Sequence, residues 1–125
     1  MVERFLAGTL PAAAWTHRAH LLVCHHLLQS ASPTDVLADL RRRIPAHNER
    51  VGLPAGRRGY HETITRYFVE AVAAGPGTAD ELLADPACRR DAPQRHWSPE
   101  ALATEAARTG WLPPDLEPLP WPAPT

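Results

Sequence analysis

The apolar residues of this chain recur with the period of an α-helix, and this periodicity is the feature that most limits its fold. At about 100° per residue, residues 14–29 place one apolar stripe on a single side of a helical wheel. Its members are His17, His20, Leu21, Cys24, Leu27 and Leu28. Similar stripes run through residues 33–52 and 60–74, and no alternating segment is long enough to argue for a sheet. The pattern therefore predicts an all-α fold.

Start and stop signals divide this pattern into three main helices. We expect the first over residues 11–29. Ser32-Pro33 places a capping serine before a proline at the first helical position and so starts the second helix, which Gly52 ends. Pro45 falls inside that helix and is expected to kink or interrupt it. The third helix is expected over residues 60–74, closed by a glycine.

Two short helices and an extended tail complete the predicted domain. Thr78 and Glu81 have the spacing of a capping box for a helix through residue 84, and Ser98-Pro99 starts a helix that is expected to run to Thr109. Residues 111–125 are rich in proline but also apolar, so we expect an extended tail across the bundle or a partner. With 125 residues, the chain is expected to be one compact bundle of three main and two short helices.

Composition excludes several functions. The formal net charge of −1 favours neither nucleic acid nor a membrane surface as a partner. All 13 basic residues are arginine, which excludes lysine chemistry, and no serine sits in a nucleophile elbow. Cys24 and Cys88 are typical of reduced cytosolic thiols. No segment approaches about 18 apolar residues and no signal peptide is evident, so a cytoplasmic protein is expected.

Histidines on the predicted inward faces indicate where the chemistry lies. His17 and His20 are one helical turn apart, about 5–6 Å at Cβ, and His61 aligns with the apolar face of the third helix. Three histidine ligands would leave one coordination position of a divalent ion open, as a catalytic metal site requires. We expect zinc first, with copper or iron behind. Cys24 and His47 are weaker candidate ligands, because a buried cysteine or histidine is more often a satisfied core residue.

Further side chains complete the predicted site. Glu62 is a candidate acid/base or orienting group, although a surface ion pair with Arg66 explains it equally well. Tyr60 is either a phenol donor at the mouth of the site or part of the core. Arg57 and Arg58, beside glycines and a helix start, are candidates to bind an anionic substrate.

Several separated motifs also resemble those of a family of short bacterial helical proteins. The motifs are W-T-H-R-A-H-L at residues 15–21, H-N-E at 47–49, G-Y-H-E-T-I-T at 59–65 and the closing W-L-P-P-D-L-E-P-L-P at 111–120. The resemblance brings no established activity with it. It implies that His17, His20 and His61 belong to one site.

The leading hypothesis is a metal-dependent enzyme that acts on a small anionic metabolite by hydrolysis, hydration, elimination or isomerisation. Its metal ligands would be His17, His20 and His61. One alternative is a metal-free binding or interaction module whose histidines are structural and whose tail docks on a partner, with homo-oligomers formed through the tail. A third is metal-free acid–base catalysis by His61 and Glu62.

Overall fold

The computed structural model describes residues 1–52, 60–75 and 77–121, and within these ranges the chain is helical without strands. Three helices are long: α2 (His17–Leu28), α3 (Pro33–Arg50) and α4 (Glu62–Ala74). The short elements are α1 (Val2–Leu6), η1 (Ala12–Ala14), α5 (Ala79–Ala84), η2 (Pro86–Cys88), η3 (Ala92–Arg95), α6 (Pro99–Leu102) and α7 (Glu105–Thr109). The predicted all-α class, with three main helices, is confirmed.

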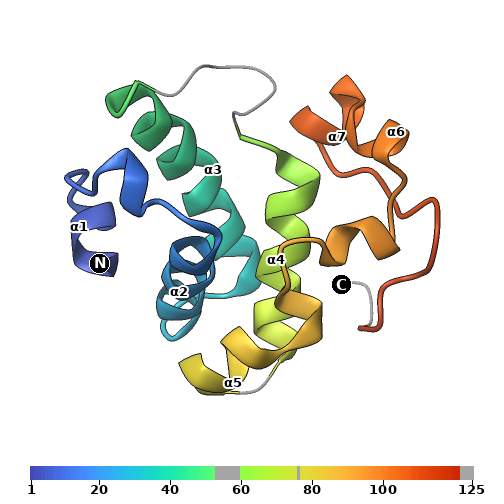
Figure 1. Ribbon diagram of the computed structural model, residues 1–125, viewed down its shortest axis with the longest axis horizontal. Helices are drawn as coiled ribbons and strands as arrows, with labels where there is room; N and C mark the ends of the chain where they lie inside the picture. The colour runs from blue at the N-terminus through green and yellow to red at the C-terminus, as the bar shows by residue number, and fades with distance from the viewer. Residues whose placement is uncertain (53–59, 76, 122–125) are drawn as a thin grey trace.

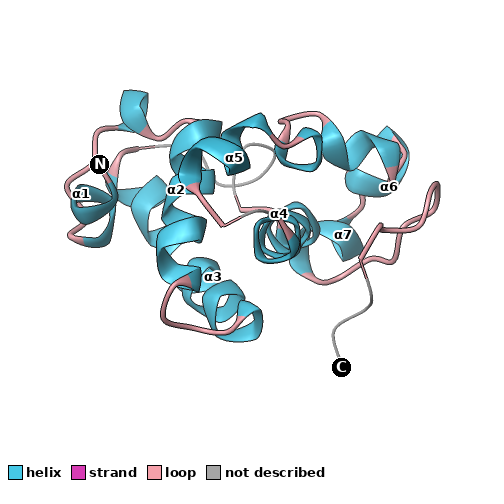
Figure 2. Cartoon of the chain, turned by 90° about the horizontal axis from the view of Figure 1, so that it is seen from below, coloured by secondary structure: helices cyan, strands magenta, loops and turns pink. Residues whose placement is uncertain are grey.

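Helix α4 is the centre of the arrangement. It packs against α2 and α3 on one side and against α7 on the other (Figure 1). Seen end-on, α4 lies between the α2–α3 pair and the C-terminal segment with α6 and α7 (Figure 2). Its inward residues, among them Tyr67, Val69 and Val72, are buried in the hydrophobic core. The candidate site described below therefore lies on one side of α4 and the tail on the other.

The first main helix begins later than predicted. The sequence indicated a start at residue 11, but the chain forms the 3-10 turn η1 there and α2 starts only at His17. Thr16 is extended (φ −94°, ψ 171°), and its Oγ1 accepts a hydrogen bond from the Ala19 amide at 3.2 Å. This threonine is thus the N-cap. The sequence analysis also missed α1, whose Phe5 is buried in the core.

Helix α3 begins as predicted but continues through its proline. Ser32 caps it by accepting from the Asp35 amide, and Gly52 follows its end at φ 76°. Of the kink or interruption expected at Pro45, the interruption does not occur, because the helix runs on to Arg50. Pro45 costs one backbone hydrogen bond on an exposed face. Burial of its neighbours Ile44 and His47 on the opposite face keeps the helix continuous.

Two more boundaries differ from the prediction. Helix α4 starts at Glu62, with His61 as its N-cap, rather than at residue 60. The helix predicted from Ser98 to Thr109 is split into α6 and α7. At the break, Thr104 Oγ1 accepts from the Ala107 amide at 3.1 Å and donates to the Ala101 carbonyl at 2.8 Å. This second cap satisfies the backbone groups that a break exposes. By contrast, Thr78 caps α5 as predicted: its Oγ1 accepts from the Glu81 amide at 3.1 Å, while its hydroxyl, rather than its amide, donates to the Glu81 side chain at 2.8 Å.

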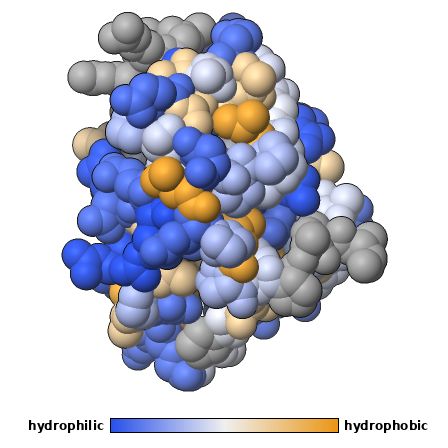
Figure 3. All heavy atoms as spheres, turned by 90° about the vertical axis from the view of Figure 1, so that its right-hand side faces the viewer, coloured by the Kyte–Doolittle hydropathy of each residue, from blue (hydrophilic) through white to orange (hydrophobic). Residues whose placement is uncertain are grey.

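The described tail, residues 111–121, lies on the chain's own bundle. The Leu112 amide donates to Thr63 Oγ1 (3.1 Å), and the Leu112 carbonyl accepts from Trp97 Nε1 (2.9 Å). Trp121 Nε1 donates to Glu70 (2.8 Å). Among the described residues of the tail, Leu116 is the large apolar side chain left exposed, at 52 %. The face with α6, α7 and the tail is accordingly mostly polar, with separated apolar patches (Figure 3).

None of the described helices combines the length and the apolar character that crossing a bilayer requires.

Candidate functional site

A cavity of about 470 Å³ lies between α2, α3 and α4. Its apolar wall comes from Leu40 and Ile44 of α3 and from α4, while α2 and the residues before it supply most of its polar groups. The lining residues are Trp15, Thr16, His17, His20, Cys24, Leu40, Ile44, Ile64, Thr65, Phe68, Val69 and Arg90. A mainly apolar cavity with a few convergent polar groups is the usual form of a small-molecule site. We call it the α2–α4 pocket.

His17 is oriented by a backbone carbonyl. Its Nε2 lies 2.8 Å from the carbonyl oxygen of Cys88, and its ring packs edge-on against Phe68. Since a carbonyl only accepts, Nε2 carries the proton and Nδ1 of the neutral ring keeps a lone pair. A histidine that binds a metal usually has its other nitrogen bonded in this way. His17, which is part of the pocket lining, therefore keeps Nδ1 as a hydrogen-bond acceptor.

His20 lines the same pocket in its neutral form. Its ring lies against Trp15, with 3.8 Å between ring centroids, and none of the described residues forms a hydrogen bond with it. Burial lowers the pKa of His20 to about 4, and positive charge on His17 or His47 would lower it further. At neutral pH the ring thus offers one unprotonated nitrogen and one N–H.

Cys24 contributes apolar surface to the pocket. It lies one turn beyond His20, and neither it nor Cys88 is in a disulfide. Burial, together with the nearby Cys88, raises the pKa of the Cys24 thiol to about 12. At neutral pH the side chain is a protonated thiol, whereas metal ligands and nucleophiles are thiolates.

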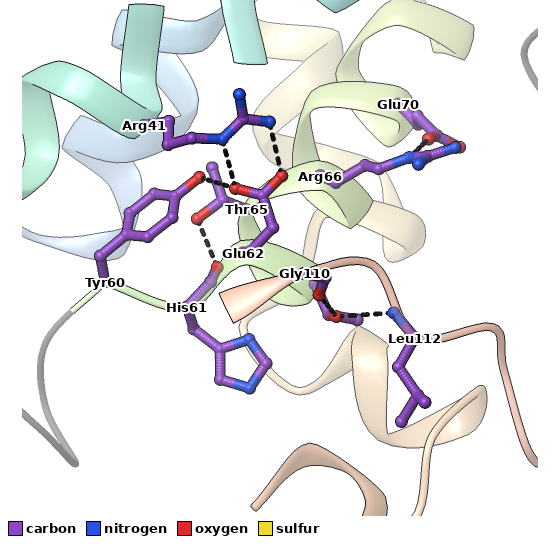
Figure 4. Close-up of polar contacts among 10 residues, drawn as sticks. Arg41, Tyr60, His61, Glu62, Thr65, Arg66, Glu70, Gly110 and Leu112 are labelled. Carbon is purple, nitrogen blue, oxygen red and sulfur yellow. Dashed lines mark hydrogen bonds and ion pairs between the residues drawn. The ribbon is translucent and has the colours of Figure 1, made fainter. Parts of the chain in front are cut away.

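The structure does not bring His61 together with His17 and His20. As the N-cap of α4, its Nδ1 accepts from the Ile64 amide at 3.2 Å, and its Nε2 donates to the Leu102 carbonyl at 2.8 Å. The ring points away from Tyr60 and Arg41 and does not line the pocket (Figure 4). Burial lowers its pKa even though the Leu102 bond favours the protonated form. Both ring nitrogens of His61 thus form hydrogen bonds to the backbone, which leaves neither as a metal ligand.

Across the described residues, no three histidine, cysteine or acidic side chains are arranged so that they could hold a metal ion. The predicted three-histidine site requires His61 to lie in the first turn of its helix. An N-cap residue instead has extended backbone, here φ −129° and ψ 111°, so its side chain leaves the helical stripe. Serine, threonine, aspartate and asparagine are the preferred caps, so a histidine at this position carries no sequence signal for a capping role.

The buried Glu62 and the half-buried Tyr60 form a hydrogen-bonded network with Arg41 of α3, whose side chain is 53 % exposed (Figure 4). The Arg41 guanidinium donates to both Glu62 oxygens, at 2.9 and 2.7 Å, and the Tyr60 hydroxyl donates to Glu62 Oε1 at 2.7 Å. Burial favours the neutral acid, but these bonds and the Arg41 charge outweigh it and hold the pKa of Glu62 below its usual range. Burial and the Glu62 carboxylate raise the pKa of Tyr60. Both groups keep one protonation state near neutral pH.

This network is an ion pair that connects α3 to α4, and none of its residues lines the α2–α4 pocket. The sequence suggested Arg66 as the partner of Glu62, but Arg66 binds Glu70 at 2.6 Å instead. Arg57 and Arg58, the predicted anion-binding residues, lie outside the described residues.

His47 is buried at 1 % exposure between Phe5 and Trp15. Within the described parts of the chain, neither of its ring nitrogens has a hydrogen-bond partner. Burial, together with the charge of Arg50, lowers its pKa. His47 does not line the pocket, so it is separate from the pair His17 and His20.

Replacing Arg41 with alanine is expected to lower the free energy of unfolding by about 1–3 kcal/mol, because Glu62 would stay buried with only Tyr60 as a partner. Urea unfolding measures this change. Arg42→Ala is the control, since Arg42 is 70 % exposed and pairs with Asp39 on its own helix. Its expected cost is about 0–1 kcal/mol. Equal losses in the two variants would contradict a stabilising ion pair between Arg41 and the buried Glu62.

Sequence reasoning missed four residues of the pocket that matter for its chemistry: Trp15, Thr16, Phe68 and Arg90. The apolar period of α4 did point to Phe68 as a core residue. Arg90 follows the 3-10 turn η2, where no periodicity indicates which way a side chain faces.

Comparisons with models of known families, with curated proteins and with solved structures found no match to this chain.

Proposed function

We propose that this chain binds a small, largely apolar molecule in the α2–α4 pocket, with His17 and His20 as its polar contacts. The observation that carries the proposal is the pair of imidazoles, one turn apart on α2, that open into an apolar cavity of about 470 Å³. His20 has no hydrogen-bond partner among the described residues, and a polar group in a pocket gains free energy when a ligand supplies one.

The neutral state of His20 suits this role. A neutral imidazole both donates and accepts, so it can bind a hydroxyl, a carbonyl or a ring nitrogen without the cost of burying a charge. His17 reaches the same cavity and is held in one orientation by the Cys88 carbonyl. The two rings thus add directional contacts to walls that otherwise recognise shape and apolar surface.

Fragment binding followed by ligand-observed NMR tests the proposal. Ile64→Trp fills the pocket from α4, whereas Ala73→Trp adds the same side chain to an exposed position of that helix and serves as the matched control. We expect apolar fragments with one hydrogen-bonding group to bind wild type and Ala73→Trp at millimolar concentrations and to lose binding to Ile64→Trp. Equal binding to both variants would place the fragments elsewhere and contradict the proposal.

A metal-dependent enzyme is the second candidate, and the Cys88 carbonyl on His17 Nε2 favours it, because that bond frees Nδ1 as a ligand. His17 and His20 would hold the ion, with zinc first and copper or iron behind. A bound ion would polarise the substrate or activate water. His61 and Glu62, which the third hypothesis needs, do not line the pocket.

Zinc titration by calorimetry of tag-free protein distinguishes the two candidates. If the chain is a metal enzyme, wild type and His25→Ala are expected to bind about one equivalent of zinc. His17→Ala and His20→Ala are expected to lose this binding. His25 is the control because it lies on the same helix but bonds to Gly77 outside the pocket. A zinc affinity that is unchanged in His17→Ala would exclude this pair as the binding site.

A further inference from the structure

We infer that the molecule bound in the α2–α4 pocket is an apolar carboxylate and that Arg90 binds its carboxylate group. This inference rests on the proposed function and adds to it the chemical class of the ligand and the residue that selects it.

The charges of the pocket favour an anion. Its described lining residues include no aspartate or glutamate, and Arg90 among them carries a guanidinium, which stays protonated in proteins. An ammonium group in this cavity would face a cation and no counter-ion. An anionic group would instead find a guanidinium that donates hydrogen bonds in a planar fork.

The guanidinium of Arg90 is available to bind a ligand. Among the described residues it has no hydrogen-bond or ion-pair partner, whereas its neighbour Arg89 lies 3.6 Å from Asp91. Most other arginines of the core helices form ion pairs within the chain; for example, Arg41 pairs with Glu62 and Arg66 pairs with Glu70. Arg90 is therefore the arginine on the pocket lining that is open to a ligand.

The fold places Arg90 at the pocket through an anchored turn. Cys88 is buried, its amide donates to the Asp85 carbonyl at 3.0 Å, and its own carbonyl binds His17 at 2.8 Å. Arg90 follows this anchored carbonyl by two residues. The contact that orients His17 thus also places Arg90 on the lining of the same cavity.

The remaining walls indicate a carboxylate with an apolar body rather than a phosphate ester. One planar fork matches the two oxygens of a carboxylate, whereas a phosphate dianion is usually held by several cations or amides. The side chains beyond Arg90 are aliphatic and aromatic, among them Leu40, Ile44 and Phe68. They offer dispersion contacts and apolar burial to a hydrocarbon chain or ring.

Four probes that share one apolar body test the inference: 3-phenylpropionate, 3-phenylpropanol, 3-phenylpropylamine and 2-phenylethyl phosphate. Dissociation constants are measured by amide chemical-shift titration of the full chain. We expect the carboxylate to bind wild type about tenfold more tightly than the alcohol, as one charge-assisted hydrogen-bonded contact would give. The amine is expected to bind more weakly than the alcohol.

Arg90→Gln supplies the decisive variant and Arg89→Gln its matched control. Both residues are exposed, and only Arg90 lines the α2–α4 pocket. Arg90→Gln is expected to raise the dissociation constant of the carboxylate about tenfold and to leave that of the alcohol unchanged. Arg89→Gln is expected to change neither dissociation constant.

The possible failures are distinguishable. Equal binding of carboxylate and alcohol to wild type, or carboxylate binding that is unaffected in Arg90→Gln, would overturn the role of Arg90 and leave the pocket proposal standing. Tighter binding of the phosphate would replace the carboxylate with a phosphate ester as the ligand class. No binding of any probe would count against the proposed function itself.

Discussion

Replacing Trp97 with alanine is expected to lower the free energy of unfolding by about 3–5 kcal/mol. Trp97 is 0 % exposed, and its indole packs edge-on against Tyr67 and Trp111 at centroid distances of 5.8 and 5.5 Å. Its Nε1 also donates to the Leu112 carbonyl of the tail at 2.9 Å. Truncation therefore removes apolar contacts, leaves a cavity and takes the indole donor from the Leu112 carbonyl.

Urea unfolding followed by circular dichroism measures the loss. Because a small domain is stable by only about 5–15 kcal/mol, Trp97→Phe provides a milder second variant. It keeps an aromatic ring but removes the bond to Leu112, and its expected cost is about 1–3 kcal/mol. A loss below about 1 kcal/mol for Trp97→Ala would show that the tail and its tryptophans are not packed as described.

Acidification from pH 6.5 to pH 4 is expected to destabilise the fold by about 2–3 kcal/mol through His20. Its pKa is lowered from 6.5 to about 4 by burial first, so between these values the unfolded chain binds the proton and the folded chain does not. The contribution of His20 to the free energy of unfolding is therefore fully present above pH 6.5. It is lost as the pH falls toward 4, at about 1.4 kcal/mol per pKa unit. The lowered pKa values of His47 and His61 act in the same direction.

Unfolding free energies measured at several pH values test this prediction. His20→Gln is expected to reduce the slope between pH 6.5 and pH 4, with His47 and His61 still contributing to what remains. His26→Gln, at an exposed position of the same helix, is expected to leave it unchanged. Carboxylates with lowered pKa values, such as Glu62, are protonated mainly at lower pH. Their loss of stabilisation therefore does not mask the pH dependence that comes from His20. The same slope in His20→Gln and wild type would contradict a buried neutral His20.

Much of the local structure could be predicted from the sequence because it depends on neighbours in the chain. Ser32, Thr78 and Ser98 each cap a helix by accepting a bond from an amide three residues later. Such caps need only a short side chain at the right position. Thr104 uses the same chemistry, but the apolar pattern around it continued and concealed the break.

The candidate site was predicted only in part, and the reason is geometric. His17 and His20 lie on one helix, so their spacing alone places them on one face, and they do line one pocket. His61 lies on another element. Whether it joins them depends on where α4 begins, and the change from first turn to N-cap turns its ring toward Leu102.

The sequence by itself determined the helical class, the starts of α3, α5 and α6 and the His17–His20 pair, because hydrogen bonds and side-chain directions within a helix follow from spacing along the chain. Only the tertiary structure decided that Arg41 pairs with Glu62, that Arg90 reaches the pocket and that the tail closes over Trp97. These contacts join segments far apart in the sequence. They form where packing buries the most apolar surface and leaves the fewest polar groups unpaired.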